Sequence, residues 1–251
     1  MALSRFGYPA RWSPRMAAGW RQGRIPWNVN HEYYNGSQKG KMSKSTMSTF
    51  QVFELFPDQH AARNYLEHRL WPNGPICPKC KNGERITTRA KDGFKHCNAC
   101  KFDFTVRTDT ILGRSHVPLH KWLYAMYLLV TARKGISSIQ LAKEIGITQK
   151  SAWFVLHRLR EACGGSSSEE AQCAQVSSDN TGSFYAVLKR GLYGIYHRPS
   201  AKHMPRYMNE VTFRLNEGNV KRHTLERLDS FVDAVVGKRV TYKDLTGTSP
   251  R

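Results

Sequence analysis

Four cysteines occur in two closely spaced pairs, and thiols at this spacing can bind a metal ion. Cys77 and Cys80 form the first pair, Cys97 and Cys100 form the second, and 16 residues separate the pairs. Two residues between thiols let the chain fold back so that both sulfurs reach one ion, and two such pairs complete a tetrahedron around zinc. Four thiolates leave no open coordination position, so we expect a structural Zn²⁺ site. A redox-active cysteine pair is the alternative that this spacing disfavours.

Short strands are expected to hold these cysteines. Residues 85–89 and 94–96 have strand-like composition, and an Asp-Gly turn at 91–93 predicts a hairpin between them. Phe102, Phe104 and Val106 alternate after the second pair and indicate a third strand. His96 is expected to be a strand residue and not a ligand, because four thiolates saturate the metal. A helix capped by Asp58 precedes the first pair.

A second motif, at residues 138–160, looks like a helix-turn-helix. Ala142 is small where two helices must approach, and Gly146, four residues later, permits a sharp turn. In such a motif the second helix enters the major groove by its N-terminal residues. At the start of that helix we expect base contacts from Thr148, Gln149, Lys150 and Ser151. Further along it we expect phosphate contacts from His157, Arg158 and Arg160. A three-helix bundle without a ligand is the alternative.

The charge of the chain favours a polyanionic partner. The 251 residues include 39 Lys and Arg against 19 Asp and Glu, a formal net charge of +20. Nucleic acid is the commonest partner that relieves such self-repulsion, and an anionic membrane surface is the rival. The longest apolar run, residues 122–130, is far shorter than the roughly 18 residues of a membrane span. Cys163 and Cys173 stand alone, so the cysteine pattern indicates a reducing compartment, and we expect a cytoplasmic, nucleoid-associated protein.

Composition divides the chain into five segments. They are a poorly organised basic extension at 1–41, an N-terminal helix with the zinc ribbon at 42–110, the helix-turn-helix at 111–163, a Gly/Ser-rich linker at 164–180 and a mostly helical region at 181–251. Helices are expected there around Phe184 and at 202–215 and 220–236. For residues 1–41 we favour an over-extended start, with Met42 or Met47 as the initiator, over an Arg-rich transit peptide.

With both motifs in place, the chain resembles bacterial insertion-sequence transposases of the ISXO-like, zinc-ribbon group from about residue 42 onward. The resemblance rests on the cysteine pairs and on residues 103–108, 116–122, 133–138, 157–160, 183–191 and 202–207. It implies an RNase H-like catalytic domain in which three acidic or amide side chains hold two divalent metals such as Mg²⁺.

The chain departs from that family where the catalytic groups should lie. Sheet-rich sequence with the first two aspartates is expected between Cys163 and Ser177, yet only the short linker occurs there, so the chain looks internally deleted. Gly182 stands where the family often has Glu, Lys189 keeps the basic residue seven positions on, and Asp179 lies three residues earlier. These three residues are interpreted as a degenerate catalytic remnant, and no catalytic residue is assigned.

Together these features predict an α+β protein with a small zinc ribbon, a helix-turn-helix and a mostly helical C-terminal remnant of an RNase H-like transposase domain. The expected function is recognition of double-stranded DNA at transposon terminal repeats without catalysis, with structural Zn²⁺, and with Mg²⁺ only if catalysis is retained. The alternatives are an active metal-dependent DNA transposase with a degenerate site and a zinc-ribbon protein-interaction module. A homodimer is left open, and no membrane association is expected.

Overall fold

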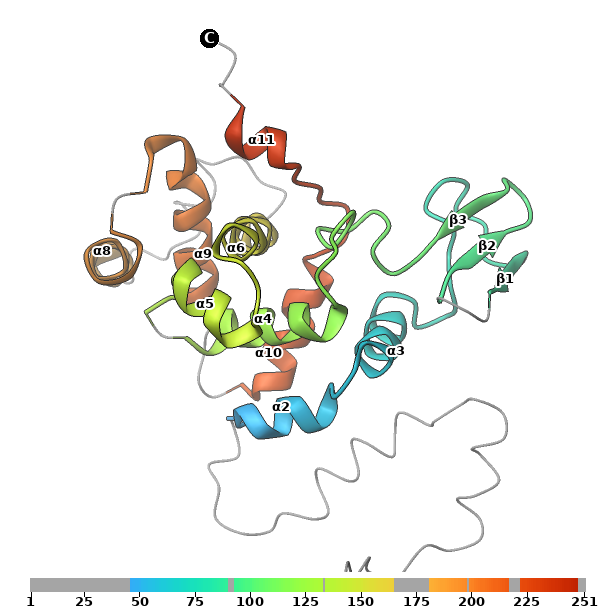
Figure 1. The fold of residues 1–251 in the computed structure, drawn as a ribbon, viewed down its shortest axis with the longest axis horizontal. Coiled ribbons are helices and arrows are strands. Elements are labelled where there is room, and N and C mark those ends of the chain that lie inside the picture. Colours follow the sequence, from blue (N-terminus) through green and yellow to red (C-terminus); the bar gives the residue numbers. More distant parts are fainter. Residues whose placement is uncertain are drawn as a thin grey trace, which may run out of the picture. The chain divides into compact units, whose positions relative to one another are not determined.

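The structure is a computed structural model that describes residues 46–89, 93–132, 134–164, 181–197, 199–216 and 222–247 (Figure 1). Every described element belongs to one compact unit, Lys44–Arg251. The expectations for residues 1–41, for the linker, for most of the Asp-Gly turn and for Cys173 and Asp179 lie outside the described residues.

Two helices lead into the cysteine-containing region. Helix α2 spans Thr49–Leu55, and Ser48 caps it in a capping box with Gln51. Helix α3 spans Gln59–Leu70, and the carboxylate of Asp58 accepts a 2.7 Å hydrogen bond from the amide of Ala61. This bond satisfies one of the amides left free at a helix start and confirms the predicted cap.

The three predicted strands form one small antiparallel sheet. Strands β1 (Ile86–Thr88), β2 (Lys95–Cys97) and β3 (Phe102–Phe104) pair in that order, and Cys97 on the central strand faces Ile86 on one side and Phe102 on the other. The third strand is two residues shorter than predicted. The core beneath the sheet is small: Cys77, Cys97 and Phe104 are buried, with the Trp71 ring edge-on to Phe104 at 5.6 Å. So few apolar groups supply little hydrophobic stabilisation.

Three helices follow the sheet. Helix α4 spans Leu119–Thr131, α5 spans Ser138–Ile145 and α6 spans Gln149–Cys163. Ser137 caps α5 and Thr148 caps α6. Between them Gly146 has φ of 61° and ψ of 52°, the left-handed conformation that glycine adopts without steric cost. The sharp turn between α5 and α6 therefore depends on this glycine.

The C-terminal part is helical, and it packs on the rest of the unit. Its elements are α8 (Thr181–Gly191), η3 (Leu192–Tyr196), η4 (Ala201–His203), α9 (Met204–Asn216), α10 (Thr224–Asp233) and α11 (Tyr242–Thr246). Helix α9 packs on α6, and α10 packs on α3 and α4. Arg227 on α10 is buried and donates to the carbonyl of Val130 on α4 at 3.2 Å. The helix predicted at 220–236 is shorter in the structure, with residues 217–221 outside the described part.

The mixed α and β composition agrees with the predicted fold class. The helices contain most of the described residues, and the strands of the described part form the cysteine-bearing sheet. Among the helices of the described ranges, none combines the length and the apolar character needed to cross a bilayer.

Candidate metal centre and nucleic-acid interface

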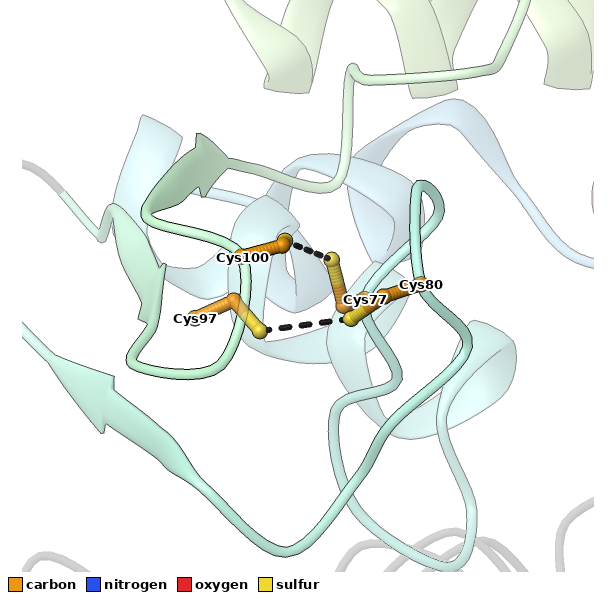
Figure 2. A group of neighbouring side chains, drawn as sticks. All are labelled: Cys77, Cys80, Cys97 and Cys100. Atoms are coloured by element: carbon orange, nitrogen blue, oxygen red, sulfur yellow. Dashed lines mark hydrogen bonds between the residues drawn. The ribbon is translucent and has the colours of Figure 1, made fainter.

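The four paired cysteines converge on one point (Figure 2). The sulfur of Cys77 lies 3.5 Å from that of Cys100, the sulfur of Cys80 lies 3.5 Å from that of Cys97, and all four lie within 4.8 Å of one another. A tetrahedral zinc ion with Zn–S bonds of about 2.3 Å places its sulfurs roughly 3.8 Å apart. The four sulfurs thus have the spacing that a four-coordinate ion requires.

Two turns of the same design present the sulfurs. After the first cysteine pair, the amide of Lys81 donates to the carbonyl of Cys77 at 2.8 Å. After the second pair, the amide of Lys101 donates to the carbonyl of Cys97, also at 2.8 Å. Both lysines have positive φ, 56° and 57°. Strand β2 ends at Cys97 and fixes the second turn to the sheet. The repeated turn explains why the spacing of two residues recurs in both pairs.

The electrostatics of the site favour a bound cation. Hydrogen bonding from the backbone of Cys100 lowers the pKa of Cys97 to about 6. Burial and the three neighbouring sulfurs raise the pKa of Cys100 to about 12. Without a cation only part of the set is ionised, because adjacent thiolates repel one another. A divalent ion would replace the remaining protons, so metal binding at this site releases protons.

His96 does not join the cysteines. Its side chain lies on β2, and Nδ1 is 2.5 Å from a carboxylate oxygen of Asp103, its cross-strand partner on β3. Asp103 also pairs with Arg89 at 3.2 Å. The histidine therefore stabilises the strand pairing, in line with the prediction that it is not a ligand.

The start of α6 presents an exposed polar group of side chains. Thr148, Gln149 and Lys150 are exposed, and Ser151 is half-buried. The side-chain Nε2 of Gln149 donates to the hydroxyl of Ser138 on α5 at 2.9 Å, and the hydroxyls of Thr148 and Ser151 lie 2.9 Å apart. The structure thus brings together the four residues predicted to contact bases.

The three residues predicted to contact phosphate lie inside the protein, which corrects that expectation. Arg158 donates from Nη1 to the carbonyls of Ile111 and Gly113, both at 2.8 Å. His157 is fully buried, with its ring centroid 4.3 Å from that of Trp153 and 4.6 Å from that of His203. Charged and polar side chains so enclosed cannot reach a phosphate on the surface.

The third of these residues, Arg160, belongs to a buried ion cluster between α6 and α9. Its Nε donates to Glu210 at 2.6 Å, and its guanidinium lies 4.1 Å from the centre of the Tyr207 ring. Glu210 also accepts from the hydroxyl of Tyr196 at 2.8 Å and pairs with Arg214. Burial would raise the pKa of Glu210, but the two arginines outweigh it and lower that pKa. The carboxylate is therefore charged and fully engaged.

Sequence patterns did not single out this cluster. Arg206, Glu210 and Arg214 follow one another at intervals of four on α9, a spacing more typical of an exposed ion-paired helix face. The cluster is buried because α9 packs on α6, and this packing places Arg160, from a distant part of the chain, in contact with Glu210.

The predicted catalytic remnant is only partly described. Gly182 lies in the first turn of α8 and Lys189 is exposed two turns later, while Asp179 is outside the described residues. Within the described ranges, one group of three or more His, Cys, Asp or Glu residues lies close enough together to hold a metal, and it consists of the four cysteines.

Comparisons with known proteins bear out the resemblance to insertion-sequence transposases. Residues 57–102 match a transposase zinc-ribbon domain, and residues 154–216 match an ISXO2-like transposase domain. The chain is also 30% identical over 111 residues to an uncharacterized protein in transposable element ISH50 from Halobacterium salinarum. That match covers 43% of this chain and 37% of the relative. No solved structure matches the chain significantly.

Proposed function

We propose that this protein binds double-stranded DNA at the terminal repeats of an insertion sequence and does not catalyse transposition. The observation that carries the proposal is the exposed first turn of α6, where Gln149 and Lys150 face solvent while most of the residues that follow along the helix are buried. A helix held in this way can enter the major groove by its N-terminal end.

The packing of α5 and α6 supports this geometry. Ala142, Ile145, Ala152 and Val155 are buried between the helices, and the left-handed Gly146 sets the turn. The bond between Gln149 and Ser138 fixes the glutamine amide relative to α5. Gln149 is the kind of side chain that can make two hydrogen bonds to adenine, and Lys150 can bond to guanine.

Zinc is the ion we assign to the cysteine site. Four thiolates at tetrahedral spacing form a closed site that suits Zn²⁺, and the ribbon core is too small to be stable without such a link. The ion would hold the ribbon together and take no part in chemistry, because no coordination position is left for water or substrate.

The assignment of no catalysis rests on the carboxylates after α6. Two-metal phosphoryl transfer needs several carboxylates free to bind cations about 3.5–4 Å apart. Among the described residues that match the transposase domain, the buried carboxylate is Glu210, and it is saturated by Arg160, Arg214 and Tyr196. Gly182 has no side-chain oxygen at the position where the family often has Glu.

DNA binding is tested with a duplex carrying the terminal repeat of the encoding element and a scrambled duplex of the same length. Affinity for both should fall steeply with salt, because cationic contacts release counterions. Replacing Gln149 by Ala should weaken binding to the repeat by roughly 1–3 kcal/mol and leave binding to the scrambled duplex nearly unchanged. The matched control is Gln59→Ala, because Gln59 is also an exposed first residue of a helix.

Catalysis is tested with the same repeat duplex and Mg²⁺ or Mn²⁺. We expect no cleavage and no strand transfer. Metal-dependent cleavage at the repeat that is lost in Asp179→Ala would restore the enzyme assignment. No affinity for any duplex, together with salt-insensitive binding to a protein partner, would support the interaction-module alternative.

A further inference from the structure

The C-terminal segment lies against α6 beside its exposed first turn. Tyr242 is the first residue of α11, and the Nζ of Lys150 lies 5.4 Å from the centre of its ring. The Phe154 ring lies edge-on to the same ring, with the two centroids 5.9 Å apart. Arg158, one turn further along α6, donates from Nε to the carbonyl of Val240 at 3.2 Å. Three residues of α6 at intervals of four therefore contact residues 240–242.

This segment is fixed in place by several independent contacts. Val240 and Leu245 are buried, and the guanidinium of Arg158 ties the segment to the Ile111 carbonyl as well. Thr241 caps α11, with its amide donating to the carboxylate of Asp244 at 2.7 Å. Residues 240–242 thus have a defined position along α6, with Tyr242 next to Lys150 in its first turn.

The exposed side chains of the segment are cationic and aromatic. Arg239 and Lys243 are exposed, and Tyr242 retains 45% of its accessible surface. Asp244 is the acidic residue of the stretch 239–247, and its carboxylate accepts from the Thr241 amide. Two exposed cations, Arg239 and Lys243, thus flank the residues that contact α6.

We propose that residues 239–243 form a second part of the DNA interface, a C-terminal arm that flanks the first turn of α6. Arg239 and Lys243 bind backbone phosphates beside the groove that Gln149 and Lys150 enter. Tyr242 is a positioning residue, since its ring holds the Lys150 ammonium by a cation–π contact. The proposal rests on DNA binding by α6, and it concerns residues outside both matched domains.

The chemistry favours contact with DNA over masking of the helix. A segment that blocked a DNA-binding surface would gain from acidic side chains that mimic phosphate, yet the exposed charges here are positive. The segment packs on α6 at Phe154 and Arg158, and Gln149 and Lys150 remain exposed even though Tyr242 touches Lys150. A cationic arm next to an exposed recognition turn adds to the attraction for a duplex.

The test measures the affinity of the full chain for the repeat duplex across a series of salt concentrations. Each of Arg239→Ala and Lys243→Ala should weaken binding to repeat and scrambled duplexes alike and reduce the slope of log affinity against log salt by about 0.9. Arg190→Ala is the matched control, because Arg190 is an exposed arginine on α8. Its salt slope should equal that of the unmodified chain.

The positioning role of Tyr242 is tested by a double-mutant cycle with Lys150. Tyr242→Ala and Lys150→Ala should each weaken binding to the repeat, and the double variant should lose less than the product of the two single losses. Tyr242→Phe keeps the ring and should retain affinity. Thermal unfolding of each variant controls for a loss of packing, and a Tyr242→Phe variant that binds as weakly as Tyr242→Ala would contradict the cation–π role.

The outcomes separate this proposal from the one on which it rests. If the unmodified chain binds no duplex, both proposals fail. If it binds and Gln149→Ala weakens specific binding, but Arg239→Ala and Lys243→Ala keep the full salt slope, the arm proposal fails alone. Tighter binding after Lys243→Ala or Tyr242→Ala would overturn it in favour of masking.

Discussion

The zinc ribbon and the α6–α9 pair bury charged groups in opposite ways. The ribbon gathers the thiols of Cys77, Cys80, Cys97 and Cys100, and the bound metal ion proposed above would balance their charge as thiolates. The α6–α9 pair gathers Glu210 with Arg160 and Arg214, which balance one another within the chain. The first region should therefore depend on metal, and the second should depend on each member of its own cluster.

The largest expected effect is the loss of the ribbon when its metal is removed. Structural zinc contributes about 10–16 kcal/mol of apparent binding free energy in small zinc-finger domains, and that energy is also folding energy. Replacing Cys80 by Ser, or adding a strong chelator, should abolish zinc binding and unfold residues 77–104. Zinc content is measured by elemental analysis, and unfolding by amide hydrogen exchange.

The helical region should remain folded when the zinc ribbon loses its metal. Amides in α5 and α6 should stay protected in Cys80→Ser protein, because their core contains no metal ligand. Global unfolding of the variant would show that the two regions fold as one. Protein purified without chelator that contains no zinc would contradict the metal assignment itself.

The two regions also differ in how far the sequence predicted them. In the ribbon, the spacing of four identical ligands defines both the chemistry and the turns, so Cys77, Cys80, Cys97 and Cys100 converge as expected. The helices and their caps at Asp58, Ser137 and Thr148 also follow from local patterns. Such features depend on residues that are close together in the sequence.

The roles of the cations on α6 could not be predicted in the same way. Arg158 and Arg160 look like surface residues in the sequence, yet their partners are Val240 and Glu210, 82 and 50 residues further along the chain. Local periodicity does not show which polar residue a distant helix will cover. The same reason hid Tyr242, although the Thr-x-x-Asp capping pattern at 241–244 marks the start of its helix.

The second prediction tests the self-balanced cluster. Replacing Glu210 by Gln leaves Arg160 and Arg214 buried without a counter-charge, and breaking a buried pair in this way costs about 3–5 kcal/mol. Glu161→Gln is the control, since Glu161 pairs with Arg206 where both side chains are only partly buried, and pairs nearer to solvent contribute less, at most about 1 kcal/mol when fully exposed. Urea unfolding of both variants measures the difference. If Glu210→Gln and Glu161→Gln lowered the free energy of unfolding equally, burial would not determine how much an ion pair contributes here.

The third prediction concerns acid and the helical region. Burial, with Arg160, His203 and Arg206 nearby, lowers the pKa of His157 to about 2, so this histidine is neutral when folded. The unfolded chain takes up its proton near pH 6.5, so the stability is complete above pH 6.5 and is lost as pH falls from 6.5 toward 2. At pH 5.0 the loss from this group is about 2 kcal/mol relative to pH 7.5.

Urea unfolding at pH 7.5 and pH 5.0 checks this dependence. His157→Phe keeps an aromatic ring beside Trp153 and His203 and should flatten the dependence. His116→Gln, a change at an exposed histidine, should leave it as in the unmodified chain. An unchanged pH dependence in His157→Phe would show that other groups cause the acid sensitivity.

The smallest expected effect comes from shortening the chain, and it separates residues that support the helical region from those that do not. Removing residues 1–41 should change neither zinc content nor the free energy of unfolding by more than about 0.5 kcal/mol, because that segment has no pattern of core residues. Removing residues 1–47 should cost about 1–3 kcal/mol, since Met47 is buried, its amide donates to Thr224 at 3.1 Å and its carbonyl accepts from Tyr127 at 2.7 Å. That loss should appear in α4 and α10 and spare the zinc ribbon, as hydrogen exchange would show. If either truncation destabilised the zinc ribbon, the ribbon and the helical region would not be independent in stability, and the prediction would be wrong.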